Sequence, residues 1–126
     1  MNNLNIENDY VKIWIEDGII HNIYKPNLEI NLAVAKIMVR DRLRVSNGIT
    51  YPLFVDISNL ISVDIGAREY LSGGEATKLI SAGAFYTTTP IAKFAGKLFL
   101  DVNQPKTPAQ IFSDKQEALD WLQQYK

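Results

Sequence analysis

One apolar run in the middle of the chain restricts the fold more than any other feature. Residues 51–58 read YPLFVDIS, so an almost unbroken apolar segment ends at a carboxylate and a hydroxyl. A run of this length without polar alternation is typical of a strand buried on both faces, as in a parallel sheet between helices. Open α/β sheets bind ligands beyond the carboxyl ends of such strands, so this polar end is the first place to look for a site.

The rest of the chain alternates segments that have strand patterns with segments that have helix patterns. Residues 11–15 alternate in the period of a strand, Asp17 and Gly18 form a favoured hairpin turn, and residues 19–24 form the returning strand. Further strands are predicted at 51–56, 80–86 and 109–112, and helices at 31–47, 63–71, 90–98 and 114–125. This order predicts one α/β domain over residues 1–126, with a mixed, mostly parallel sheet, an N-terminal antiparallel hairpin and flanking helices.

Helix ends are predicted from capping residues. Asn31 is expected to cap the first helix, and Thr89 the third, with Pro90 at the first helical position, where its missing N–H is not needed. For the second helix, Ser62 is the expected cap and Asp64 lies in the first turn. Each of these predictions depends only on local chemistry.

Helix faces are predicted from apolar spacing. The expected core-facing residues of the first helix are Leu32, Ala35, Val39 and Leu43, and Ile37 and Met38 widen this apolar face. Those of the third helix are Ile91, Phe94, Ala95 and Leu98.

Composition excludes several classes of function. The 13 basic and 14 acidic residues give a net charge of −1, which provides no general attraction to nucleic acid or to an anionic membrane. The absence of cysteine excludes disulfides, thiolate catalysis and cysteine-ligated metals. No signal-peptide pattern and no apolar run near the roughly 20 residues of a membrane span are present, so we expect a cytoplasmic protein without integral membrane association.

The order of the elements resembles the STAS-type domain of the bacterial anti-sigma-factor antagonists. It is more similar still to a group of uncharacterised bacterial proteins that share this fold. The resemblance covers nearly the whole chain after Asp9, and the segments that carry it are residues 53–58, 64–70, 82–85, 89–91, 112–114 and 117–122. It implies a STAS-like fold.

The phosphorylation site of the antagonists is missing. Members of that family carry a phosphorylatable serine in an Asp-Ser-Ser-Gly segment at the start of the helix after the central strand. The matching residues here are Asp64, Ile65, Gly66 and Ala67, so the aspartate is kept and the serines are replaced. A phosphorylation switch needs an acceptor hydroxyl at that position. The resemblance therefore implies the fold without the regulatory cycle.

Two groups of side chains are candidates for a functional site. The residues predicted to lie near the carboxyl ends of the strands, where they could bind a polar or anionic ligand, are Asp56, Ser58, Asp64, Thr87, Thr88 and Thr89. The residues that could form an interaction surface are Trp14, Tyr24, Lys36, Arg40 and Arg44. The alternatives are that the first group caps helices and loops, that the three cations are a solvated helix face, and that the two aromatic residues belong to the core.

No catalytic or metal site is predicted. His21 is the sole histidine and lies in a strand between Ile19 and Ile23, without partners at metal-ligand spacing. Gly73 and Gly74 lack the lysine-serine pattern of a phosphate-binding loop and are expected to end a helix.

The sequence leaves two classes of function open. The first hypothesis is a non-enzymatic regulatory or protein-interaction module, which could form a homodimer, binds an unidentified protein partner and needs no cofactor. The alternative is a domain that binds a small apolar or anionic ligand in a pocket. An enzyme would require Asp56, Asp64 or His21 to converge on a cleft.

Overall fold

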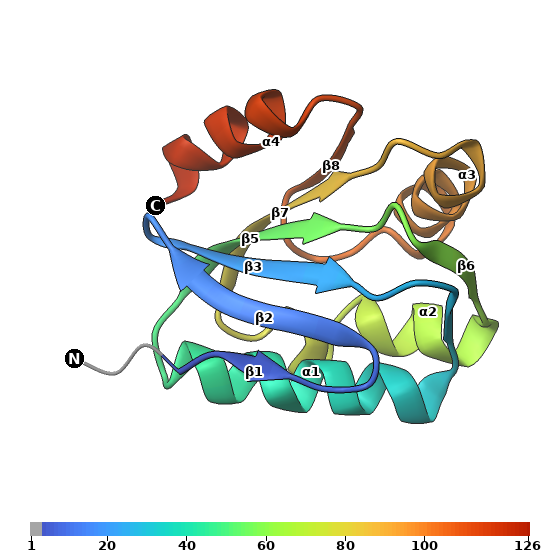
Figure 1. Cartoon of the computed structure of the whole chain (residues 1–126), viewed down its shortest axis with the longest axis horizontal. Coiled ribbons are helices and arrows are strands. Elements are labelled where there is room, and N and C mark those ends of the chain that lie inside the picture. Colours follow the sequence, from blue (N-terminus) through green and yellow to red (C-terminus); the bar gives the residue numbers. More distant parts are fainter. Residues whose placement is uncertain (1–3) are drawn as a thin grey trace.

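The computed structural model describes residues 4–126 and contains a six-stranded sheet between two layers of helices (Figure 1). The strand order is β1-β2-β3-β5-β7-β8. These strands are β1 (Ile6–Glu7), β2 (Val11–Glu16), β3 (Ile19–Tyr24), β5 (Tyr51–Asp56), β7 (Ile80–Tyr86) and β8 (Ala109–Phe112). The strands from β3 to β8 are parallel, and β1 and β2 are antiparallel to their neighbours. The predicted fold class is therefore confirmed.

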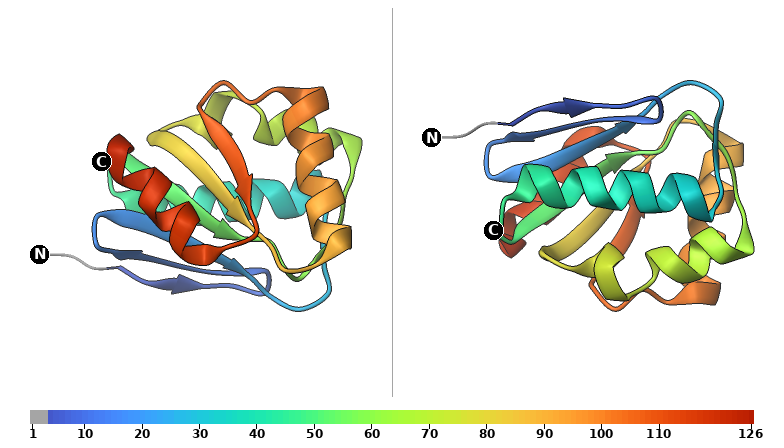
Figure 2. Two further views of the ribbon diagram at one scale, coloured as in Figure 1. Left: turned by 90° about the horizontal axis from the view of Figure 1, so that it is seen from above. Right: turned by 90° about the horizontal axis from the view of Figure 1, so that it is seen from below.

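The helices lie on both faces of this sheet. The four α-helices are α1 (Leu32–Ser46), α2 (Ile65–Leu71), α3 (Pro90–Leu98) and α4 (Lys115–Leu122). Short helical segments are η1 (Gly74–Thr77), η2 (Phe99–Asn103) and η3 (Gln123–Tyr125). Figure 2 shows α1 and α2 on one side and α4 on the other, while α3 lies beyond the carboxyl ends of the parallel strands. Within residues 4–126, no helix combines the length and the apolar composition that crossing a bilayer requires.

Strand β5 is central, as its apolar sequence predicts. It pairs with β3 on one side and with β7 on the other. Val55 packs in the core on the α1 side, and Phe54 packs against the small residues Ala84 and Ala118 on the α4 side. Burial on both faces explains why the segment has no polar alternation before Asp56.

The predicted ends of α1 and α3 are confirmed. The Asn31 side chain accepts a hydrogen bond from the Val34 amide at 2.9 Å. At the other end of α1, Asn47 has a left-handed backbone with φ 49°. Thr89 Oγ1 accepts from the Ala92 amide at 3.3 Å. Side-chain capping of free helix amides depends on neighbours in sequence, which is why it can be predicted from sequence.

The predicted start of the second helix is wrong. Residues Leu60–Val63 form strand β6, which pairs in parallel with strand β4 (Leu28–Ile30) in a small second sheet. Asp64 is the N-cap of α2, and its carboxylate accepts from the Ala67 amide at 2.8 Å. Ser62 is therefore part of a strand and caps no helix. The pairing of β4 with β6 joins segments 30 residues apart, so local patterns gave no sign of it.

The predicted inward face of α3 is wrong at Ile91 and Phe94, whereas Ala95 packs against the core. Ile91 is 63% exposed and Phe94 is 71% exposed, whereas Ala92 and Gly96 are buried. A Cβ atom on Gly96 would lie only 3.1 Å from Ile111 Cδ1, so the helix comes very close to its neighbours at this point. The small side chains face inward because only they allow this approach, and the large apolar ones are left at the surface.

On α1 the predicted face is confirmed at Ala35, Met38 and Val39 but is wrong at Leu32, and it omits two charged residues that are buried. Leu32 is 39% exposed, while Asp41 and Arg42 are almost completely buried. The apolar members of the buried face are Val34, Ala35, Met38, Val39 and Val45. Two charged residues thus occupy positions that periodicity alone assigns to apolar side chains.

Candidate functional site

The loops that follow β5 and β7 bring several of the predicted ligand-binding residues together. The Thr88 amide donates a hydrogen bond to Ser58 Oγ at 3.1 Å, and Thr89 Oγ1 donates to the Ser58 carbonyl at 3.2 Å. The Thr89 amide donates to Thr87 Oγ1 at 3.1 Å, and Thr87 is buried. Parallel strands end at the same edge of a sheet, which is why residues 30 apart in sequence meet there.

The carboxylates of this region have local partners. Asp56 accepts a hydrogen bond from the Ser58 amide at 3.0 Å, and Asp64 caps α2. These contacts bind each loop to itself and leave Asp64 outside the cluster formed by residues 58 and 87–89. Ligand binding by the six residues stays a prediction.

An apolar groove lies beside these loops, between α3 and β6. Its volume is about 420 Å³. The lining residues are Ile61, Ser62, Val63, Arg68, Pro90, Ile91, Phe94, Ala95 and Leu98. Ile61 is 46% exposed, and Ile65, at the start of α2, is also exposed. We call the exposed apolar residues Ile61, Ile65, Ile91 and Phe94 the α3 patch. Ile61, Ile91 and Phe94 line the groove together, and grouped apolar side chains at a surface are typical of an interaction site.

Basic side chains lie on α3 and in the wall of the groove. Lys93 and Lys97 are exposed on α3, and among residues 4–126 neither has a carboxylate within ion-pair distance. Arg68 lies in the groove wall, where its Nη1 donates to the Val63 carbonyl at 2.8 Å. The groove thus combines apolar walls with the positive charge of Arg68.

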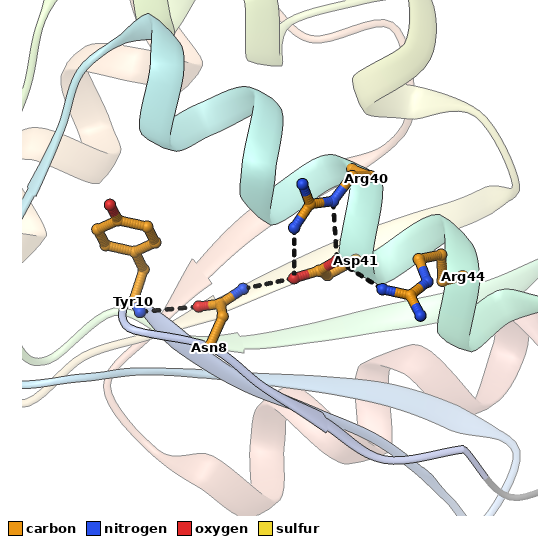
Figure 3. A network of polar contacts seen from close by, with 5 residues as sticks. All are labelled: Asn8, Tyr10, Arg40, Asp41 and Arg44. Carbon is orange, nitrogen blue, oxygen red and sulfur yellow. Dashed lines mark hydrogen bonds and ion pairs between the residues drawn. The ribbon is translucent and has the colours of Figure 1, made fainter.

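The predicted cationic stripe on α1 has a structural partner, the buried carboxylate of Asp41. Arg40 Nε lies 3.0 Å and Arg44 Nη1 3.5 Å from Asp41 Oδ1 (Figure 3). Asn8 Nδ2 donates to Asp41 Oδ2 at 2.9 Å. Burial opposes ionisation of Asp41, but the hydrogen bonds from Arg40 and Asn8 outweigh it, so the net pKa of Asp41 is lowered. This cluster ties the segment before β2 to α1.

The other predicted surface residues lie apart from one another. Lys36 Nζ lies 5.9 Å from the centre of the Tyr70 ring. Tyr24 is 8% exposed and belongs to the core on the α1 side, and burial raises its pKa. Trp14 lies on the opposite face of the hairpin, since it stacks on His21. Tyr24 and Trp14 therefore form no common surface.

His21 is buried between aromatic rings. Its ring lies 5.2 Å from Trp14 and 5.4 Å from Phe54, measured between centroids. Burial lowers the pKa of His21, and the charge of Glu16 offsets this effect in part. In the described range 4–126, no group of three or more histidine or carboxylate side chains is placed to hold a metal ion.

An internal cavity of about 110 Å³ lies between the sheet and the helices α1, α2 and α3. Two buried polar side chains line it, Arg42 from α1 and Asn22 from β3. Neither was singled out in the sequence. The sequence does contain a sign that Arg42 is buried. It follows Ala35 by seven residues and Met38 by four, and this helical spacing places its positive charge on the core-facing side of α1.

Comparisons with known proteins support the fold. A family model described as a domain of unknown function, DUF7793, matches residues 13–126. The chain belongs to the DUF7793 family. A solved structure is similar over 97% of this chain and 98% of its own, with a TM-score of 0.64 and 19% identity. It is an uncharacterized protein of the DUF3478 family with a SpoIIAA-like fold, from Shewanella loihica PV-4. No curated protein matches.

The STAS-like resemblance of the sequence is thereby confirmed at the level of the fold. At this identity the likeness carries no information about activity or partners. The function of this DUF7793 domain therefore has to be inferred from its own residues.

Proposed function

We propose that this domain is a non-enzymatic protein-interaction module, and that the α3 patch is its contact surface. The observation that carries the proposal is the exposure of Ile91 and Phe94, two large apolar side chains on one face of a nine-residue helix. Exposing them to water is unfavourable by roughly 1.5–3 kcal/mol per side chain relative to burial. A partner that covers them gains this free energy.

The shape and charge of the surface indicate what kind of partner fits. The groove lies beside helix α3 and is lined mainly by apolar side chains, an arrangement that suits the apolar face of an amphipathic helix. Arg68 in the groove wall favours an acidic residue beside that apolar face. The proposed occupant is therefore an amphipathic helix with an acidic residue at the edge of its apolar face, contributed by a different protein.

Site-specific crosslinking tests the proposal. A photoreactive phenylalanine analogue replaces Phe94 in the full chain, and a matched control replaces Gln116, an exposed residue on α4 at the opposite side of the sheet. We expect one protein to be crosslinked from position 94 and not from position 116. The purified partner should then bind the unlabelled domain, and Phe94→Ser with Ile91→Ser should weaken binding by about tenfold or more.

Two outcomes would contradict the proposal. Equal crosslinking from both positions would remove the α3 patch as a specific surface. A dimer in light scattering that dissociates in the Phe94→Ser variant would assign the patch to a second copy of this chain. Both substitutions are at exposed positions, so the melting temperature of the free domain should change little.

A further inference from the structure

The cavity contains a buried cation without an anionic partner among residues 4–126. Arg42 is 3% exposed. Its Nη2 donates to the carbonyls of Lys78 at 3.0 Å and Ala76 at 3.3 Å, while its Nη1 is buried without any hydrogen-bond partner. Among residues 4–126, no carboxylate lies within ion-pair distance of this guanidinium. A buried charge is unfavourable by several kcal/mol unless an opposite charge or a full set of hydrogen bonds compensates it.

The charge is retained at neutral pH. Burial lowers the pKa of Arg42 to about 10, and the more distant charge of Glu75 raises it in part. The group is therefore still a cation at pH 7. Glu75 itself is exposed and lies 3.9 Å from Lys78, so it offers Arg42 no direct contact.

A second polar side chain faces the same cavity without a partner. Asn22 is 7% exposed, and its side-chain oxygen forms no hydrogen bond. It comes from β3, on the opposite wall from Arg42 on α1. By rotation, its amide can present either an acceptor or a donor to a molecule in the cavity. Two buried polar groups without partners in one cavity can both form hydrogen bonds to a molecule with complementary groups.

The remaining walls of the cavity limit the size and polarity of the molecule that it can bind. They are formed mainly by apolar side chains, including Met38, Leu53, Val55, Leu60 and Phe85. The volume of about 110 Å³ is smaller than the cavity of ~150 Å³ that accepts benzene. A long-chain lipid does not fit this space, whereas a body of a few carbon atoms does. Half-exposed Thr77, Pro105 and Thr107 line the cavity as well, which places one end of it close to the surface.

We propose that the cavity binds a small monocarboxylic acid, with its carboxylate on Arg42 and Asn22 and its short apolar body against the sheet. One cation matches one negative charge. A phosphate monoester carries more charge and more acceptor oxygens than these apolar walls can satisfy. This site is separate from the α3 patch, so the inference goes beyond the proposed protein interaction.

Calorimetric titration of the full chain tests the assignment with pairs of ligands that differ only in charge. The pairs are acetate with acetamide, propanoate with propanamide, and butanoate with butanamide, and inorganic phosphate is a separate probe. We expect at least one carboxylate to bind with one-to-one stoichiometry and about tenfold or more tighter than its amide, the factor for one charge-assisted hydrogen bond. Phosphate should not bind. If none of the three carboxylates binds more tightly than its amide, the site is not an anion site and the proposal is overturned.

Substitutions then locate the binding. Arg42→Met keeps an unbranched side chain and removes the charge, and it should weaken carboxylate binding by about tenfold or more. Arg44→Met is the matched control, because Arg44 is a cation on the same helix but is exposed and pairs with Asp41. It should leave carboxylate affinity unchanged within about twofold. An equal loss of carboxylate affinity in both variants would show a general effect of charge and would contradict binding at Arg42. If Arg42 served only to hold η1, Arg42→Met would fail to fold. The titrations of the unaltered chain with each acid and its amide still decide whether the cavity binds a carboxylate.

Discussion

The imidazole of His21 and the indole of Trp14 are stacked with an angle of 8° between their planes. They face each other across the antiparallel pair of β2 and β3, where their Cα atoms are register partners. The stack buries the sole titratable group of the chain whose ordinary pKa is near 6.5.

This burial predicts that stability decreases as pH falls below the ordinary pKa of histidine, about 6.5. Because burial lowers the pKa of His21 in the folded state, the unfolded chain binds its proton first as pH falls. The contribution of His21 to stability is therefore fully present above about pH 6.5 and decreases below it, by at most about 1.4 kcal/mol per pH unit. Urea unfolding at several pH values measures this slope. His21→Phe keeps the stack and should lose the slope in this window; an unchanged slope in His21→Phe would contradict the assignment.

Removing the carboxylate of Asp41 should destabilise the domain. Asp41→Ala leaves Asn8 and Arg40 without their common acceptor and should lower the free energy of unfolding by about 1–3 kcal/mol. Because the pKa of Asp41 is lowered in the folded state, this stabilisation is present above its ordinary pKa of 3.8 and is lost as pH falls through the folded-state value. The exposed Asp9 provides the control. Equal effects of Asp9→Ala and Asp41→Ala in chemical denaturation would refute the proposed difference.

The hydroxyl of Thr89 should matter more than its methyl group. It accepts from the Ala92 amide and donates to the Ser58 carbonyl, so it both caps α3 and ties that helix to the loop after β5. Thr89→Ala should lower stability by about 1–2 kcal/mol, and Thr89→Ser should retain most of it. Thermal unfolding of the two variants separates them, and the same melting temperature for both would mean that the hydroxyl contributes nothing.

The hairpin turn predicts a contrast between two glycines. Gly18 has φ +70° beside Asp17 at φ 53°, the backbone that a two-residue hairpin turn requires. Gly18→Ala should destabilise by about 1 kcal/mol, since a side chain disfavours this conformation. Gly66 lies in α2, where a new Cβ has only ordinary contacts at 3.7 Å or more, so Gly66→Ala should be neutral or stabilising. Similar unfolding midpoints for the two variants would contradict this contrast.

The sequence by itself determined the elements whose cause is local. The caps at Asn31 and Thr89, the turn at Gly18 and the buried strand at residues 51–56 follow from chemistry within a few residues, and the structure contains all of them. The order of these elements was enough to predict the STAS-like fold.

Only the tertiary structure decided which faces are covered. Gly96 lets α3 approach Ile57 and Ile111, and this contact, invisible in local periodicity, turns Phe94 to the solvent. Likewise, α1 buries Arg42 against the carbonyls of Ala76 and Lys78, which lie more than 30 residues further along the chain. Both candidate sites arise from packing between distant segments. Neighbouring residues in the sequence determine where a helix forms. The elements that pack against the helix determine which of its side chains are exposed to water, buried in the core or placed in a cavity.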